Sequence, residues 1–156
     1  MVRKAEVIRE KLDRYRGIII SGSTEIEGAL LFWLNQYFIP ESGRKSHILC
    51  FEVLDDLNFS KKIDLYKKIF PVDYGSNPRS KKQSEIINAL GRVNSLRNDV
   101  AHGLLSSNRS SKDAIILFNF KHSSKSGQIR LDGNTIRQFE KDKKYLLEAF
   151  IGQDHY

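Results

Sequence analysis

Apolar positions recur at helical spacing along most of the chain. Residues 3–16 place a narrow apolar seam among alternating basic and acidic side chains, which predicts a solvated helix and leaves its continuation past Gly17 open. Residues 18–39 are apolar around much more of the helical circumference, so a helix here needs two burial partners. We expect one partner to be the domain core and the other to be a second copy of the chain. Pro40 ends this helix.

The middle and the end of the chain predict further helices. His47–Leu57 is a short apolar-polar segment that we interpret as helical. Ser60 is expected to cap an amphipathic helix. Ser80 to Gln83 has the pattern of a capping box and opens a helix that Gly103 is placed to stop. Thr135 to Gln138 repeats that capping pattern before a final amphipathic helix.

The hydrophobic period changes between the last two predicted helices. Residues 114–120 are β-branched and aromatic, residues 128–131 alternate, and Ser123 to Gly127 lies between them as a hairpin loop. We find no internal repeat and no domain boundary. The fold class predicted for residues 1–156 is therefore a single, mainly α domain, a bundle of four to six helices with a small C-terminal β-hairpin.

Composition narrows the partners and the compartment. Lysine and arginine number 26 against 19 acidic residues, and the net charge of +7 favours anionic partners, with nucleic acid first and an acidic membrane surface second. The chain lacks a signal-peptide pattern, and its longest apolar run, Ala29 to Leu34, is too short to cross a bilayer. We therefore expect a cytoplasmic protein without a membrane partner.

The sequence predicts no metal and no cofactor. Cys50 is the sole cysteine, and its apolar neighbours favour a buried small hydrophobe over a nucleophile. The four histidines have no metal-ligand spacing.

Basic side chains gather on two consecutive predicted helices and the loop between them. They are candidates for an RNA-binding surface that follows phosphates, although a solvated charged face is the commoner explanation of such a pattern. These candidates are Lys61, Lys62, Lys68, Arg79, Lys81 and Lys82.

One cluster has the composition of a catalytic site. Arg97, Asn98 and His102 place a guanidinium, a carboxamide and an imidazole within six residues, and on a helix Asn98 and His102 share one face. Such groups suit metal-independent RNA cleavage, in which the 2′-hydroxyl attacks its own phosphate. One histidine does not conveniently move both protons, so a twofold dimer that supplies a second set is expected.

The same three residues have a structural alternative. Arg97 then forms a buried ion pair with Glu25, Glu27 or another carboxylate of the first helix and fastens two helices together. Asn98 and His102 then bond the loose backbone groups at the helix end.

The segment Arg97-Asn98-Asp99-Val100-Ala101-His102 resembles the motif of the HEPN superfamily, which is an arginine, a polar residue, three variable residues and a histidine. The helix pattern over roughly residues 15–103 is also similar to that superfamily. The resemblance implies a dimeric, metal-independent endoribonuclease, with Arg97 and His102 as the catalytic pair and Asn98 as the polar auxiliary. It also implies a toxin of a toxin–antitoxin pair or an effector of antiviral abortive infection.

Two departures keep a second hypothesis open. The segment at 114–131 is not part of the minimal HEPN bundle, and the Arg-Asn-x-x-Ala-His-Gly ending is similar to the mannitol-operon-repressor group. The alternative function is therefore a non-catalytic HEPN-like regulator or adaptor that binds a protein partner. Catalysis requires accessible Arg97 and His102 side chains, whereas the alternative places Arg97 against a carboxylate. For the nuclease we expect RNA as substrate, a homodimer through residues 18–39, and an antitoxin or another protein partner.

Overall fold

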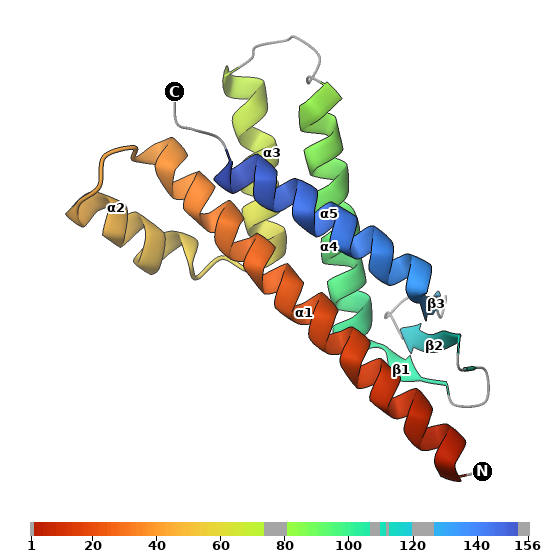
Figure 1. Ribbon diagram of the computed structural model, residues 1–156. Coiled ribbons are helices and arrows are strands. Elements are labelled where there is room, and N and C mark those ends of the chain that lie inside the picture. Colours follow the sequence, from red (N-terminus) through yellow and green to blue (C-terminus); the bar gives the residue numbers. More distant parts are fainter. Residues whose placement is uncertain (1, 74–80, 107–109, 112, 120–126, 153–156) are drawn as a thin grey trace.

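A computed structural model describes residues 2–73, 81–106, 110–111, 113–119 and 127–152 of the chain. The described part is mainly helical and carries one small antiparallel sheet (Figure 1). The predicted mainly α fold with a small β element is thereby confirmed. In chain order the elements are α1 (Val2–Phe38), α2 (Arg44–Ile48), the π-helical segment η1 (Leu49–Leu54), α3 (Phe59–Asp73), α4 (Lys81–His102), β1 (Leu104–Leu105), β2 (Ala114–Asn119), β3 (Gly127–Asp132) and α5 (Gly133–Ile151).

Helix α1 runs without interruption through Gly17, so the two N-terminal helical patterns belong to one helix. It crosses the whole bundle and packs against α3, α4 and α5 (Figure 1). Its buried stripe includes Ile19, Ile26 and Leu30, all with no exposed surface. Within the described residues α1 is the one helix long and apolar enough to cross a bilayer, from Ala5 to Phe38. Counting uninterrupted apolar residues missed this helix, and 39% of its most apolar window is buried.

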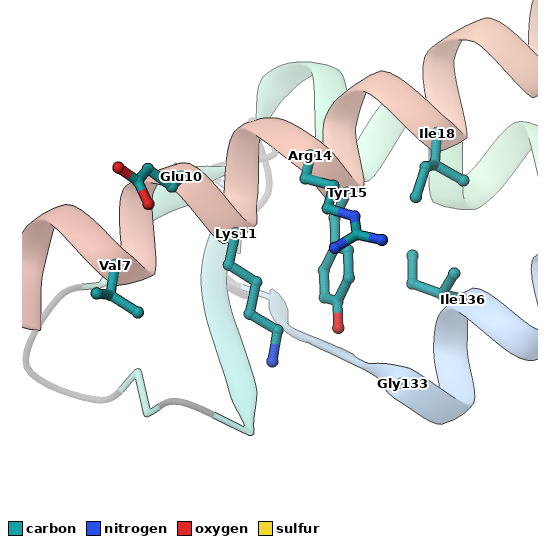
Figure 2. Close-up of a pocket in the computed structure, with 8 residues that line it drawn as sticks. All are labelled: Val7, Glu10, Lys11, Arg14, Tyr15, Ile18, Gly133 and Ile136. Atoms are coloured by element: carbon teal, nitrogen blue, oxygen red, sulfur yellow. The ribbon is translucent and has the colours of Figure 1, made fainter.

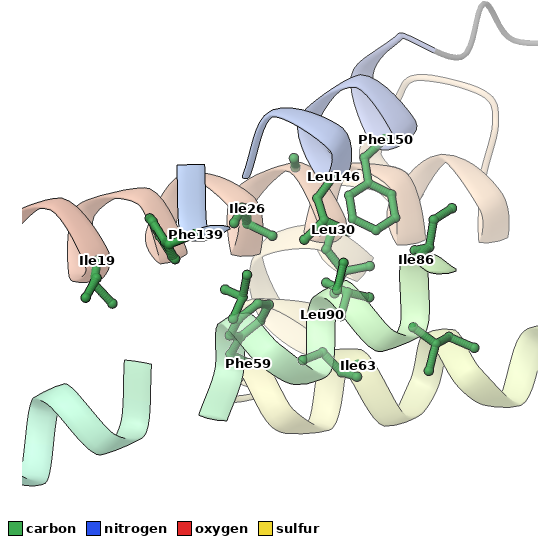
Figure 3. Close-up of a cluster of buried hydrophobic side chains, with 14 of the residues drawn as sticks. Ile19, Ile26, Leu30, Phe59, Ile63, Ile86, Leu90, Phe139, Leu146 and Phe150 are labelled. Carbon is green, nitrogen blue, oxygen red and sulfur yellow. The ribbon is translucent and has the colours of Figure 1, made fainter. Parts of the chain in front are cut away.

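The core is one cluster of buried side chains from α1, η1, α3, α4, α5 and the sheet. Figure 3 shows the part of it that lies between the helices. Phe59 of α3, Leu90 of α4 and Phe139 of α5 meet the buried stripe of α1 there. Trp33 extends the cluster, because its ring lies 4.9 Å from that of Tyr66, measured between centroids. Each of the four helices α1, α3, α4 and α5 therefore buries one face in a shared core.

A second burial partner was predicted for residues 18–39. It would have to cover the apolar side chains of this segment that are not buried in the core. Phe32 is 48% exposed and Phe38 is 44% exposed, and both lie in the last two turns of α1. The exposed apolar surface of α1 is therefore concentrated at its C-terminal end.

Two predicted helix caps are wrong by a few residues. The side chain of Asn58, not of Ser60, accepts the backbone N–H of Lys61 at 3.0 Å, so α3 begins at Phe59. At α5 the carboxylate of Asp132 accepts the N–H groups of Asn134 and Thr135 at 3.0 Å. Each segment offered two capping residues close together, and the first in the chain is the one used. The predicted cap Ser80 lies outside the described residues, and α4 begins directly after it.

The predicted hairpin is present and has a third strand. β2 and β3 pair antiparallel, with Leu117 opposite Ile129, while most of the predicted loop lies outside the described residues. β1 follows α4 directly and pairs antiparallel with β2, with Leu104 opposite Phe118. A two-residue strand is too short to show an alternating pattern. Because of β1, the C-terminal end of α4 is attached to the sheet.

Candidate functional site

Arg97, Asn98 and His102 lie in the last two turns of α4, at the end of the helix beside β1 (Figure 1). His102 is the last residue of α4 and is exposed, whereas Arg97 and Asn98 are half-buried. Asn98 and His102 are one turn apart, so their side chains project from the same face. The helix that carries them is held by buried residues on both sides of Arg97, because Val93 is 1% exposed and Val100 is fully buried.

The end of α4 is fixed by an arginine that sequence analysis missed. Arg16 of α1 donates from Nη2 to the carbonyl oxygen of Gly103 at 2.9 Å, and from Nε to the carbonyl oxygen of Val100 at 3.3 Å. The last carbonyl groups of a helix have no partner within the helix, and a cation there also opposes the negative end of the helix dipole. Arg16 therefore sets where the backbone of the motif lies relative to α1.

Gly103 stops α4 as predicted, but for a different reason than a left-handed backbone. Among the described glycines only Gly43 has a φ in the left-handed range. A Cβ on Gly103 would lie 2.5 Å from the carbonyl oxygen of Asp99 and 3.0 Å from Cβ of Leu117. Glycine is therefore needed at this position because the chain passes so close to the helix end and to β2.

The carboxylates proposed as partners of Arg97 are used by lysines. Glu27 accepts from Nζ of Lys62 at 2.8 Å, and Glu25 pairs with Nζ of Lys143 at 2.7 Å. Within the described part of the chain, no ion pair or hydrogen bond engages the Arg97 guanidinium. The specific ion pairs of Arg97 with Glu25 or Glu27 are therefore wrong, and it is Arg16 that bonds the helix-end carbonyl groups.

A second arginine of α4 does fasten two helices. Arg92 donates from Nη2 and Nε to the two carboxylate oxygens of Asp142 on α5, at 2.7 and 2.9 Å. Gln138 donates to the same carboxylate at 3.0 Å, and Asp142 is only 5% exposed. The hydrogen bond to Asp142 raises the pKa of Arg92, so the guanidinium stays charged. The helix-joining ion pair expected at Arg97 is thus found five residues earlier.

One of the candidate RNA-binding lysines is buried, and two others lie far along α4 from the motif. Lys62 is 3% exposed and its ammonium is held by Glu27, so its assignment to an RNA-binding surface is wrong. Lys61, Lys68, Lys81 and Lys82 are exposed, and Arg79 lies outside the described residues. Lys81 and Lys82 open α4, about 30 Å along the helix from His102.

Cys50 lies in η1 and is half-buried. Burial, followed by the neighbouring Asp55 carboxylate, raises the pKa of its thiol above the ordinary value. A thiol that keeps its proton is a poor nucleophile. Within the described ranges, no three histidine, cysteine, aspartate or glutamate side chains are grouped in a way that could hold a metal ion.

Comparison with models of protein families, with curated proteins and with solved structures finds no match for this chain.

Proposed function

We propose that the protein is a metal-independent endoribonuclease of the HEPN type, with its active site at the C-terminal end of α4. The observation that carries the proposal is the surroundings of Arg97. This arginine follows Leu90 and Val93 on the buried stripe of α4, yet no carboxylate within the described residues pairs with it. A partly desolvated guanidinium without an acidic partner is suited to bind a phosphate.

The neighbouring groups suit the rest of the reaction. The 2′-oxygen of the RNA attacks the adjacent phosphorus and gives up its proton to a base, while the bond from phosphorus to the 5′-oxygen breaks and that oxygen takes a proton. The products are a 2′,3′-cyclic phosphate and a 5′-hydroxyl. His102 is exposed and serves as one of the two proton-transfer groups. Arg97 neutralises the charge that develops on the phosphoryl oxygens, and Asn98 donates a hydrogen bond.

The second proton-transfer group comes from a second copy of the chain under this proposal. The exposed aromatic residues of the segment 18–39 are Phe32, Tyr37 and Phe38, and they lie at least about 24 Å along α1 from Arg16, which contacts the motif. A homodimer formed through them alone would keep the two His102 side chains far apart. We therefore place the pairing of the two motifs along the exposed face of α4 that includes His102, with residues 18–39 as a separate contact.

The resemblance to the HEPN superfamily supplies the biological setting of the proposal. According to this resemblance, the protein acts on cellular RNA as a toxin or an antiviral effector, and an antitoxin or another protein partner inhibits its activity. A non-catalytic adaptor is the second candidate. It is favoured by apolar side chains exposed on α2 and η1, where Ile48 is 45% exposed and Phe51 is 57% exposed.

Cleavage of a labelled structured RNA in excess EDTA tests the proposal. We expect the wild-type protein to leave cyclic phosphate ends, and His102→Ala to lower the cleavage rate by about 10²-fold or more. His47→Ala is the matched control, because His47 is an exposed histidine on α2 outside the motif. If neither wild type nor His47→Ala cleaves any of several RNAs while both stay folded, the adaptor is the better account.

A further inference from the structure

Residues 44–54 form one short helix at the outer edge of the bundle, beside the C-terminal end of α1 (Figure 1). The two segments α2 and η1 are continuous, because Ile48 and Leu49, where they join, both have helical backbone angles. One side of this helix faces α1, since Ser46 is buried and its hydroxyl accepts from Nδ2 of Asn35 at 2.7 Å. The opposite side is exposed.

The middle of the exposed side is apolar. Ile48 and Phe51 are both exposed, and the Phe51 ring lies against the His47 ring with 4.7 Å between centroids. The apolar area extends onto α1, because the exposed Phe38 lies less than one helical turn after Asn35, where α2 is attached. Exposed apolar side chains that gather in this way indicate a contact with another molecule.

The two ends of the exposed side carry opposite charges. Arg44 and Lys45 are exposed in the first turn, whereas Glu52, Asp55 and Asp56 are exposed at the C-terminal end. Within the described residues, no ion pair engages any of these five side chains. Their charges are therefore available to a partner.

This order of charges opposes the helix dipole. The N-terminal end of a helix is partly positive and favours acidic side chains, while the C-terminal end is partly negative and favours basic ones. Residues 44–54 have the reverse order at both ends, so these charges do not stabilise their own helix. They match instead a second helix of the same kind lying antiparallel, whose acidic end meets the basic end of the first.

Neighbouring charges leave this order in place. Glu41 is acidic but lies before the turn at Gly43 and outside the helix. Nζ of Lys62 lies 3.5 Å from the backbone carbonyl oxygen of Asp55, but the ammonium is held by Glu27 at 2.8 Å. The helix therefore keeps two cations at one end and three carboxylates at the other.

Charges are mixed, by contrast, in the groove of about 490 Å³ between the N-terminal half of α1 and the junction of β3 with α5 (Figure 2). Glu10, Lys11 and Arg14 line this groove together. Nζ of Lys11 also lies 5.4 Å from the centroid of the Tyr15 ring, so it already has an aromatic neighbour. Such a lining does not select a partner by charge, whereas the separated charges of residues 44–54 do.

We propose that residues 44–54 bind the same residues of a second copy of the chain, antiparallel about a twofold axis at the middle of the helix. The axis places Arg44 and Lys45 of each copy beside the carboxylates of the other copy. It also brings the Ile48 and Phe51 side chains of the two copies together. The helix is only about 15 Å long, so the contact is small and we expect association at micromolar concentration.

This inference goes beyond the proposed cleavage, because the contact uses no residue of the motif on α4. It is also separate from the pairing of two motifs that the proposed cleavage requires.

Sedimentation analysis of two charge-reversal variants tests the proposal. Arg44→Glu with Lys45→Glu reverses the basic end, and Asp55→Lys with Asp56→Lys reverses the acidic end. Each variant alone places like charges opposite each other and should raise the Kd of self-association by at least about 100-fold. An equimolar mixture of the two variants restores opposite charges at both ends, so it should associate within about tenfold of wild type. Both variants should fold, because each new charge matches the helix dipole.

Lys81→Glu with Lys82→Glu is the matched control, because these are two adjacent, exposed cations in the first turn of another helix, α4. This control should associate as wild type does. Phe51→Ser removes an apolar side chain from the centre of the contact and should raise the Kd by about tenfold or more. The salt dependence of association should stay as in wild type, because no charge is changed.

The proposal is overturned if wild type shows no self-association that the charge-reversal variants lose, or if the mixture of the two variants fails to associate. It is also overturned if the Lys81→Glu and Lys82→Glu control loses association equally. Loss of binding to phosphatidylserine vesicles by Phe51→Ser, with its mass unchanged, would overturn it in favour of a lipid surface. Mass is the readout, so an absence of RNA cleavage would leave this proposal standing while it contradicts the proposed function.

Discussion

Arg92 and Arg97 lie five residues apart on the same helix, and their surroundings are opposite. Arg92 donates to both carboxylate oxygens of Asp142, which Gln138 also contacts, and so joins α4 to α5. Arg97 projects from the buried stripe of α4, and no carboxylate in the described part of the chain pairs with it. An arginine that serves packing is expected to have the first environment, and one that binds an anion is expected to have the second.

Two further ion pairs join helices in the same way as Arg92 does. Lys62 of α3 pairs with Glu27 of α1, and Lys143 of α5 pairs with Glu25 of α1. The two carboxylates of α1 named as partners of Arg97 are thus used by lysines. The difference between paired and unpaired cations separates the structural basic residues from the functional candidates better than their position in the sequence does.

The largest stability effect is expected at Lys62, the most buried of these cations. Lys62→Met leaves Glu27 without its partner and should lower the free energy of unfolding by about 2–3 kcal/mol, less than for a fully buried pair because Glu27 is 20% exposed. Urea unfolding measures this loss. Lys61→Met, at the exposed neighbour, should change stability by at most about 0.5 kcal/mol.

A double variant sharpens this prediction. Lys62→Met combined with Glu27→Leu removes both charges and should recover most of the lost stability. Equal stability of Lys62→Met and Lys61→Met would show that the buried ion pair contributes nothing to the free energy of unfolding. Paired and unpaired cations would then no longer differ in their structural role.

A smaller effect is expected at the glycine that ends α4. Gly103→Ala forces the chain away from Asp99 and Leu117 and should cost about 1–3 kcal/mol, with a parallel loss of cleavage because His102 is displaced. Gly28→Ala is the control, since a Cβ there meets nothing within 4 Å, and it should stabilise α1 by about 0.5–1 kcal/mol. Thermal unfolding in which Gly103→Ala is as stable as Gly28→Ala would contradict the close contact at the helix end.

The smallest effect concerns a carboxylate that is bonded by backbone groups rather than by a buried cation. The N–H of Thr135, ahead of the Arg130 side chain, lowers the pKa of Asp132 below its ordinary value. Because the pKa is lower in the folded protein, the stabilisation is complete above the unfolded pKa of about 4 and is lost as the pH falls through the folded value. Asp132→Asn keeps a capping side chain, so its stability should fall less than that of wild type between about pH 5 and pH 2. Stability that falls equally with pH in wild type and in Asp132→Asn would contradict the stabilising role of the Asp132 carboxylate.

Much of the fold could be predicted because the hydrophobic period is a local property. The pattern located the helices and the β2–β3 hairpin. It failed where two polar residues competed for one cap, as Asn58 and Ser60 do, and where the strand β1 is shorter than the period that would reveal it.

The candidate site was only partly predictable from the sequence, because the position of its backbone depends on contacts between residues that are far apart in the chain. Arg16 and Gly103 are 87 positions apart in the chain, so no local pattern indicates that one holds the other. Lys62 and Glu27 are 35 positions apart in the chain. The sequence does not reveal this ion pair, so Lys62 was predicted to be an exposed lysine. The motif itself is local, which is why Arg97, Asn98 and His102 could be chosen from the sequence.

The most direct test compares Arg97→Ala with Arg92→Ala in two measurements, RNA cleavage in EDTA and thermal unfolding. Arg97→Ala should cleave about 100-fold more slowly or worse, with its melting temperature within about 2 °C of wild type. Arg92→Ala should lose about 1–2 kcal/mol of stability and cleave at near the wild-type rate while folded. A stable, fully active Arg97→Ala, or a strongly destabilised one, would contradict the assignment of Arg97 to chemistry.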